Sequence, residues 1–348
     1  MTIDSTHLDP ADDHPYLGEI DPSSLWAEAQ QWNLVDAAGN GVIYHLCTMP
    51  NQLHLRHNVM AIVLDDGSVY AAKVVGPSTQ PDQFGVDFLH ARTVDPFKRW
   101  HLHFDGAVQR VNPDLSTVGF LPDGPHLAAR FDLELSAAHP AWIPGARHGE
   151  DADSLFSTAY AFHHEQPFHA SGTIEVDGQT VIVDGAIGHR DHSRGERTSN
   201  YDPRTGEYRK QSAFWINGIF DSGWAFATME GLFEPGGRFE RSALFTDEGV
   251  IAAVVHGGLQ LTSTLADPVD FEINLCTEDG SSRTITFHCT HGINFTAVGP
   301  SEWCLGADLS NANSSVWAMY FAELECDGER GLGFVDRSTR VRNLTRLT

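Results

Sequence analysis

The sequence is poor in cysteine and has no long apolar run. Its five cysteines are widely separated and form no C-x-x-C pair: Cys47, Cys276, Cys289, Cys304 and Cys326. An odd, scattered set of this kind indicates neither a zinc knuckle nor a disulfide framework and is typical of the reducing cytoplasm. The stretch 1–21 is polar and acidic, and no run approaches the length of a membrane span. We therefore expect a cytoplasmic protein without a signal peptide or membrane insertion.

Positive charge is also scarce. The 348 residues include 22 Lys and Arg against 47 Asp and Glu, which gives a formal net charge of −25 at pH 7. A field of this sign repels nucleic-acid phosphates and anionic membrane surfaces, so we expect no nucleic-acid partner. Hydrophobic residues make up 41% of the chain, which is enough for a buried core in one large or two ordinary domains.

Several motif classes are missing as well. No G-x-G-x-x-G follows a strand and no P-loop occurs, which argues against dinucleotide and nucleoside-triphosphate enzymes. Ser193 lacks the first glycine of a nucleophile elbow, so the sequence does not indicate a serine hydrolase.

Helical periodicity is almost absent, and Asp-Gly turns are frequent instead. Asp-Gly between alternating apolar runs is a strong hairpin signal. It predicts five hairpins, with strand pairs at 59–64 and 69–75, 100–104 and 107–111, 172–176 and 180–183, 271–276 and 283–289, and 316–326 and 331–340. One short helix is expected at 23–31, capped by Ser23 or Ser24. The fold class is therefore all-β, with antiparallel barrels or sandwiches and few short helices.

A Pro- and Gly-containing stretch at 136–153 has neither strand nor helix periodicity. We place a domain boundary just after it, which divides the chain into 1–160 and 161–348. Each part holds several hairpins of similar length, which permits an internal duplication, although no residue-level repeat stands out. Two such domains side by side leave a groove between them in which a small molecule can bind.

The segment Gly188–Arg197 is especially rich in ionisable side chains and follows the apolar strand 180–184. Most charged segments are exposed salt-bridge loops. Here acids, histidines and three guanidinium groups share one short element, so an inward-facing Asp191 can be tuned by Arg190 or His192. The segment therefore predicts the wall of a reaction chamber.

The same segment carries a resemblance to a known family. With His163–Gln166, Gly172–Gly178 and Asp184-Gly185, it resembles the signature of bacterial proteins related to carotenoid 1,2-hydratases and the AttH-like proteins. The similarity extends to Ser24–Glu28 with Trp32-Asn33, to Pro96–Gly106 and to Gly331–Phe334. Relatives usually have Trp after the Ser of the Arg-Asp-His-Ser motif, whereas this chain has Arg194.

The resemblance implies two lipocalin-like β-domains and an enzyme that needs no cofactor. Such an enzyme handles a hydrophobic, isoprenoid- or polyketide-like substrate by adding or removing water, by isomerising a double bond or by closing a ring. A small hydrophobic substrate is the expected partner, and a homodimer is left open.

The residues themselves permit this chemistry. Hydrating an alkene or dehydrating an alcohol requires an acid beside a weak base in a dry pocket. Asp191 is the first candidate acid, because an apolar cavity raises the pKa of a carboxyl group, and His192 or Glu165 can position or activate the water. Strand alternation places Asp191 and His192 on opposite faces, so one of the two is structural. Arg190 shares the face of His192 and is expected mainly as a salt-bridge partner.

Aromatic side chains are the candidates for substrate contacts: Trp100, Phe214, Trp215 and Trp224. Their π faces can stabilise a cationic transition state, although most aromatic residues in strands belong to the core. Glu230, close after Trp224, is a second candidate acid.

Two alternatives remain open. His101 and His103 flank Leu102 and point to one face of a strand, as in β-barrel metalloproteins, but 19 histidines make such a pair expected by chance. We expect no metal and no other cofactor. The second alternative is a lipocalin-like carrier of an apolar ligand, with the charged segment as an internal brace. A carrier would be favoured by an Asp191 that is paired and closed off, and an enzyme by an Asp191 or Glu165 that faces an apolar pocket with a raised pKa.

Overall fold

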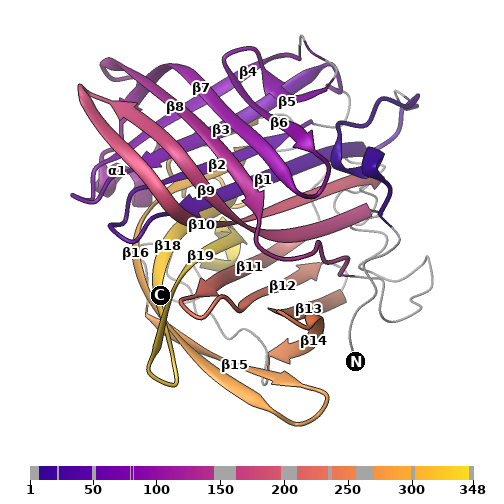
Figure 1. The fold of residues 1–348 in the computed structure, drawn as a ribbon. Coiled ribbons are helices and arrows are strands. Elements are labelled where there is room, and N and C mark those ends of the chain that lie inside the picture. The colour runs from indigo at the N-terminus through magenta and orange to yellow at the C-terminus, as the bar shows by residue number, and fades with distance from the viewer. Residues whose placement is uncertain are drawn as a thin grey trace.

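Antiparallel strands form almost the whole described chain (Figure 1). The computed structural model describes residues 8–21, 23–48, 52–78, 80, 82–144, 162–196, 210–233, 237–255, 270–298 and 302–344. Only short helices occur within these ranges: η1 (Pro10–Asp13), α1 (Pro113–Val118) and α3 (Val341–Leu344). The predicted all-β fold with few short helices is confirmed.

A sheet of ten strands comes first in the chain. Its strands are β1 (Trp26–Val35), β2 (Gly41–Cys47), β3 (Leu55–Val63), β4 (Val69–Pro77), β5 (Gln83–Val86), β6 (Leu89–Asp95), β7 (Arg99–Arg110), β8 (His126–Ala137), β9 (Phe162–Val176) and β10 (Gln179–Glu196). Pairing of β10 with β1, and of β4 with β7, closes β1–β4 and β7–β10 into a ring, which we call barrel 1. The β5–β6 hairpin extends its edge.

The second sheet has nine strands and the same closure. Its strands are β11 (Lys210–Phe220), β12 (Ala225–Phe233), β13 (Gly237–Thr246), β14 (Gly249–Val255), β15 (Phe271–Thr277), β16 (Ser282–Val298), β17 (Glu302–Leu305), β18 (Ser315–Cys326) and β19 (Glu329–Arg340). The last strand again pairs with the first, β19 with β11, and β15 pairs with β16 to complete barrel 2. The change of sheet falls between β10 and β11, later in the chain than the predicted division after residue 160.

Four of the five predicted hairpins are confirmed: β3–β4, β9–β10, β15–β16 and β18–β19. The hairpin predicted around Asp105-Gly106 is wrong. Strand β7 runs through these residues without turning, and they pair with Arg130 and Ala129 of β8. An Asp-Gly pair makes a hairpin only where the glycine takes a positive φ, as Gly178 and Gly328 do, and Gly106 does not.

The predicted helix at 23–31 is also wrong, because most of it is strand β1. Its Ala, Glu and Gln residues favour a helix locally. In the folded chain Gln30 and Trp32 face the inside of barrel 1, where the Trp32 indole donates to Gln30 (3.1 Å), while Gln31 faces barrel 2. Polar residues on both buried faces hide the alternation that would have identified a strand.

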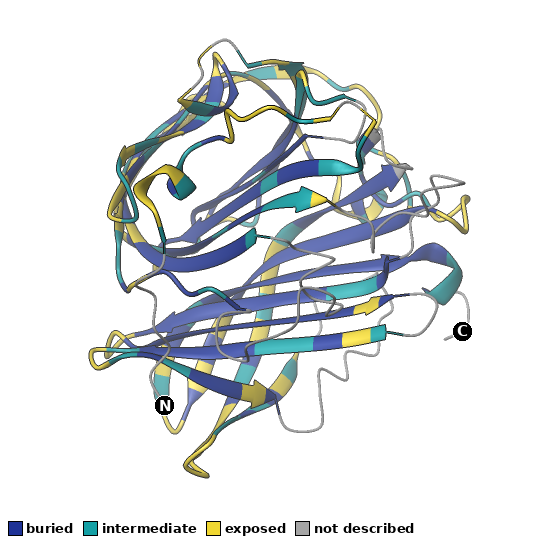
Figure 2. Cartoon of the chain, turned by 90° about the vertical axis from the view of Figure 1, so that its right-hand side faces the viewer, coloured by how far each residue is buried: buried dark blue, intermediate teal, exposed yellow. Residues whose placement is uncertain are grey.

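Aromatic side chains fill the inside of barrel 1, where Trp32, Trp100, Phe104, Phe131 and Phe168 are fully buried. A separate core fills barrel 2 around Phe226 and Phe287. A third cluster joins the two, because the outer face of β1–β4 packs against side chains of barrel 2 such as Phe295 and Trp317. The strands between the two barrels are accordingly almost entirely buried (Figure 2). Across the described ranges, no helix has the length and apolar character needed to cross a membrane.

Candidate functional site

The segment Ala186–Ser193 of strand β10 is almost entirely buried on both faces, because its inner face belongs to the core of barrel 1 and its outer face is covered by barrel 2. Alternation then sends Arg190 and His192 into barrel 1 and sends His189 and Asp191 toward barrel 2. We call the first group and its partners the barrel cluster and the second group and its partners the junction cluster. The predicted separation of Asp191 from His192 is thus what the strand shows.

Arg190 is the centre of the barrel cluster. Its guanidinium group forms an ion pair with Asp13 of η1 and lies over the rings of Trp100 (4.4 Å) and Trp32 (4.9 Å). Asp13 also accepts hydrogen bonds from the Phe97 amide (2.7 Å) and the Trp100 indole (2.8 Å). A buried guanidinium group held by a carboxylate and two aromatic faces is a structural brace, as the sequence predicted for Arg190.

His192 and Arg194 complete the barrel cluster. His192 Nε2 lies 2.9 Å from Glu28 Oε1, and burial lowers the pKa of His192 despite this carboxylate. Arg194 donates to Asp12 Oδ1 (2.6 Å) and lies over the Phe162 ring (4.4 Å). Arg190 and His192 therefore lie on the other side of the strand from Asp191.

Glu165 of β9 anchors the junction cluster. Its Oε2 accepts a hydrogen bond from the Trp215 indole of β11 (2.7 Å) and lies 3.3 Å from His189 Nε2, and its Oε1 lies 3.3 Å from His163 Nε2. Burial alone would raise the pKa of Glu165, but the contacts with His163 and His189 outweigh it and hold the pKa at about 2. Glu165 is therefore an ionised, fully engaged carboxylate.

Asp191 is the member of this cluster that reaches accessible surface. Its Oδ2 lies 3.8 Å from His163 Nε2, so the imidazole lies between the carboxylates of Asp191 and Glu165. The Asp191 side chain is 20% exposed, whereas those of His163, His189 and Glu165 are exposed by 1% or less. A ligand that meets the cluster would meet it at Asp191.

The junction cluster follows one row across the outer face of barrel 1. Glu165, Asp191, Gln31 and His45 are register neighbours on β9, β10, β1 and β2. A row of barrel 2 lies opposite, formed by Trp215, Asp336 and Met319 on β11, β19 and β18. Trp215 contacts Glu165 and Gln31 contacts both Asp336 and Met319, so the two rows face each other.

Asp336 is the functional candidate that sequence analysis missed. Burial raises the pKa of Asp336 to about 7; Lys210 and a hydrogen bond with Gln31 act against this shift, and the charge of Asp191 adds to it. The sequence predicted a raised pKa for Asp191 or Glu165; the pKa of Glu165 is lowered instead, and the raised pKa is found at Asp336, which the sequence analysis did not name. A signal was present in Gly188-x-x-Asp191-x-Ser193, because the same spacing recurs at 333–338.

Among the aromatic candidates for substrate contacts, Trp215 alone joins the junction cluster. Trp100 lies in barrel 1, Phe214 in the core of barrel 2, and Trp224 stacks on Phe220 with ring centroids 4.0 Å apart. Glu230 lies on β12 in an ion pair with Arg238 (2.9 Å).

His101 and His103 share one face of β7, as predicted. Both contact a carboxylate of β8 that the sequence did not place: Asp132 lies 2.8 Å from His101 Nε2 and 3.4 Å from His103 Nδ1. Within the part of the chain that the structure describes, no group of three or more His, Cys, Asp or Glu side chains has the geometry for a metal ion.

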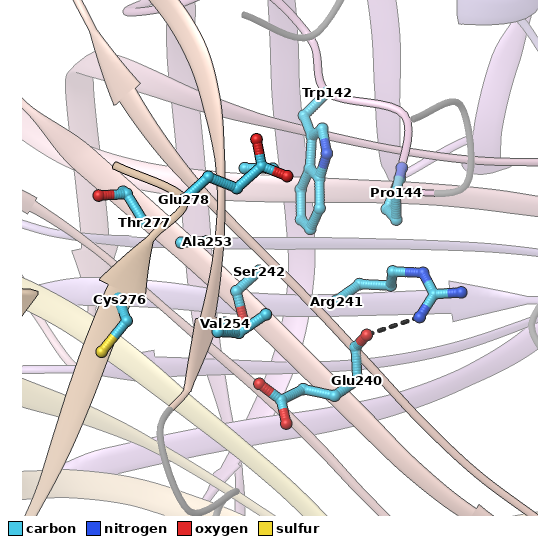
Figure 3. A pocket seen from close by; sticks show the side chains of 11 residues that line it. Trp142, Pro144, Glu240, Arg241, Ser242, Ala253, Val254, Cys276, Thr277 and Glu278 are labelled. Atoms are coloured by element: carbon cyan, nitrogen blue, oxygen red, sulfur yellow. Dashed lines mark hydrogen bonds between the residues drawn. The ribbon is translucent and has the colours of Figure 1, made fainter. Parts of the chain in front are cut away.

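A small hollow lies beside the junction cluster, between Trp142 and strands β13–β15 (Figure 3). Its volume is about 180 Å³, below the roughly 300 Å³ of the smallest common ligand pockets. The Trp142 backbone pairs with that of Glu165 through N···O distances of 2.7 and 2.8 Å, so one residue forms a wall of the hollow and holds the strand of the anchoring carboxylate.

Two solved structures share this fold over nearly their full length. A protein assigned as AttH from Nitrosomonas europaea is 12% identical with a TM-score of 0.56, covering 93% of this chain and 95% of that one. Kievitone hydratase from Nectria haematococca is 10% identical with a TM-score of 0.52, covering 97% of each chain. Such identities show the fold alone, and they confirm an AttH-like β fold. A family model described as a domain of unknown function, DUF7064, matches residues 9–341, and no curated protein matches the chain.

Proposed function

The chain belongs to the DUF7064 family, and we propose that this member is a cofactor-independent hydro-lyase. It adds water to, or removes water from, a hydrophobic alkenol or isoprenoid-like substrate, and Asp191 is the group that exchanges a proton with it. The hydratase fold seen in kievitone hydratase supports the reaction class, and the apolar side chains around the junction support a hydrophobic substrate.

The observation that carries the proposal is the position of Asp191. It is a partly exposed carboxylate at the edge of a buried ionic cluster, next to the imidazole of His163. Active sites combine a reacting group that is accessible with supporting groups that are buried and fixed. The barrel cluster has one carboxylate of similar exposure, Asp12 (21%), but Arg194 lies only 2.6 Å from it, whereas Asp191 lies 3.8 Å from His163 Nε2.

In the proposed reaction, Asp191 transfers the protons and the neighbouring residues position it. In dehydration the carboxyl group of Asp191 passes its proton to the hydroxyl group of the substrate, the C–O bond breaks and water leaves. The carboxylate then takes a proton from the adjacent carbon, whose C–H electron pair becomes the new double bond. Glu165 orients His163 beside Asp191, and the Trp215 indole holds Glu165. Hydration is the same path in reverse.

The competing function is a non-catalytic carrier, which predicted an Asp191 that is paired and closed off. Asp191 lies 3.8 Å from His163 Nε2, but its side chain is 20% exposed. The enzyme hypothesis predicted a raised pKa at Asp191 or Glu165, and the pKa of Glu165 is lowered instead. The proposal therefore depends on the exposure of Asp191. An isomerase or cyclase would use the same proton transfer at Asp191 and differs only in its product, which keeps the mass of the substrate.

The test is turnover of a panel of acyclic terpenols and the matching alkenes by protein treated with a chelator. Gain or loss of water by the wild type, reduced by about 10²–10⁴-fold in Asp191→Asn, is the expected result. Asp184→Asn, an exposed carboxylate of the same strand, is the matched control and should retain full activity. Products of unchanged mass would replace the hydro-lyase by an isomerase or cyclase, and binding without turnover would replace it by a carrier.

A further inference from the structure

The two barrels present equivalent strands to each other. In barrel 1 the last strand, β10, pairs with the first, β1, so that Asp191 opposes Gln31 and Ser193 opposes Ala29. In barrel 2 the last strand, β19, pairs with the first, β11, so that Asp336 opposes Trp215 and Ser338 opposes Ala213. The Gly-x-x-Asp-x-Ser pattern therefore has not only the same spacing but also the same register in both barrels.

A close backbone approach repeats as well. A Cβ atom at Gly188 would lie 2.3 Å from the carbonyl oxygen of Asn33, and one at Gly333 would lie 2.5 Å from that of Asn217. Asn33 and Asn217 occupy the same position on the two first strands, opposite the residue after the glycine. The equivalence of Asp191 and Asp336 thus rests on several neighbouring positions.

The contacts between the two barrels also occur in corresponding pairs. Because Gln31 corresponds to Trp215 and Glu165 corresponds to Met319, the Trp215–Glu165 contact (2.7 Å) and the Gln31–Met319 contact (4.0 Å) are related to each other. Such an exchange is what a pseudo-two-fold axis between the barrels produces. Asp191 and Asp336 correspond to each other, so they lie on either side of that axis.

We propose that Asp191 and Asp336 titrate as one pair that carries a single proton at neutral pH, with Asp336 as the positioning residue that keeps a proton available to Asp191. This inference rests on the proposed function and deepens it. A partly exposed aspartate on its own is ionised at neutral pH and has no proton to give. Two carboxyl groups that share a site cannot both ionise, as in carboxylate dyads.

The electrostatic surroundings support a shared proton. Asp336 is buried, and its pKa is raised by burial and by the charge of Asp191. Lys210 of β11 is the cation that acts on Asp336, and Gln31 of β1 hydrogen-bonds it. Asp191 faces His163, and the charge of Arg190 on the other face of β10 also acts on it.

The pair keeps the chemistry balanced. Asp191 gives its proton to the leaving hydroxyl group and then recovers a proton from the substrate carbon. Dehydration therefore leaves the number of protons on the Asp191–Asp336 pair unchanged. After loss of a proton to solvent, the pair binds one again, and the repulsion between the two carboxylates favours that uptake.

The decisive experiment follows the Asp336 carboxyl by ¹³C NMR against pH, which does not depend on turnover. The midpoint is expected near pH 7 in the wild type and lower in Asp191→Asn, because the neighbouring charge is gone. Asp184→Asn should leave the midpoint in place. A wild-type midpoint near 4, or a midpoint that Asp191→Asn does not move, overturns the pair.

Activity gives the second arm. Asp336→Asn should shift the optimum of kcat/KM to lower pH and reduce it at pH 7.5 by about tenfold or more, and Asp336→Glu should restore part of it. An unchanged pH profile in a folded Asp336→Asn protein overturns the role of Asp336. If no substrate is turned over by the wild type, the proposed function fails while the NMR titration still decides whether the pair exists.

Discussion

The two faces of strand β10 carry clusters of similar composition and opposite character. On the barrel face each acid is opposed by its own base, since Asp13 pairs with Arg190, Asp12 with Arg194 and Glu28 with His192. On the junction face Glu165 is held by its partners, but the charge of Asp191 adds to the raised pKa of Asp336. We expect the ion pairs of the barrel face to hold the strand in place, and we propose that the junction face supplies the group that exchanges a proton.

The largest effect should come from breaking the barrel face. Asp13→Ala leaves the fully buried Arg190 without its carboxylate, which costs about 3–5 kcal/mol of the free energy of unfolding. Urea denaturation measures this loss. Asp12→Ala removes the more exposed pair with Arg194 and should cost clearly less. Equal losses in the two variants would mean that burial does not distinguish the two pairs.

The junction face should make the free energy of unfolding depend on pH. Because the pKa of Asp336 is raised from 3.8 to about 7 in the folded chain, the unfolded chain releases this proton first, and the free energy of unfolding falls as the pH rises from about 4 to 7. The full fall amounts to roughly 4 kcal/mol for one group.

Asp336→Asn removes this dependence, so its free energy of unfolding should exceed that of the wild type at pH 8 by a margin that shrinks toward pH 4. Denaturation midpoints over this range provide the measurement. A variant that is less stable than the wild type at pH 8 would show that the ionised carboxylate is stabilised rather than repelled.

The support of Glu165 should have an intermediate effect. Trp215→Phe removes the indole that donates to this buried carboxylate and should lower the free energy of unfolding by about 1–3 kcal/mol. Trp224→Phe, whose indole donates to the partly exposed Glu329 (3.0 Å), is the matched control with a smaller effect. If both substitutions lower the free energy of unfolding by the same amount, the hydrogen bond to the buried Glu165 stabilises the fold no more than the one to Glu329.

The smallest effect is expected away from both clusters. Asp132→Asn disturbs contacts with His101 and His103 on the outside of barrel 1, where the carboxylate is 39% exposed, and should change the free energy of unfolding by less than about 0.5 kcal/mol. Thermal unfolding at neutral pH tests this. A large loss there would contradict the view that ionic groups matter in this protein mainly where they are buried.

Sequence reasoning was most reliable where structure depends on near neighbours. Asp-Gly turns located four hairpins, and the two-residue period of a strand separated Asp191 from His192. It failed for β1, because this strand has polar residues on both faces. One face, with Gln30, lies inside barrel 1, and the other face, with Gln31, contacts barrel 2. The partners of Arg190 and Asp191 could not be predicted either, because Asp13 and Asp336 are distant in sequence and come close only through closure of barrel 1 and packing of barrel 2.

The seam of barrel 1 has a consequence for its motions. Strands β4 and β7 pair through two residue pairs only, Tyr70 with Arg110 and Ala71 with Gln109, whereas β10 pairs along most of its length with both neighbours. In the ring the seam lies opposite the β1–β10 pair. Local opening on heating therefore begins across the barrel from Asp191, and amide hydrogens at the seam exchange with solvent well before those of the strands that hold the two aspartates.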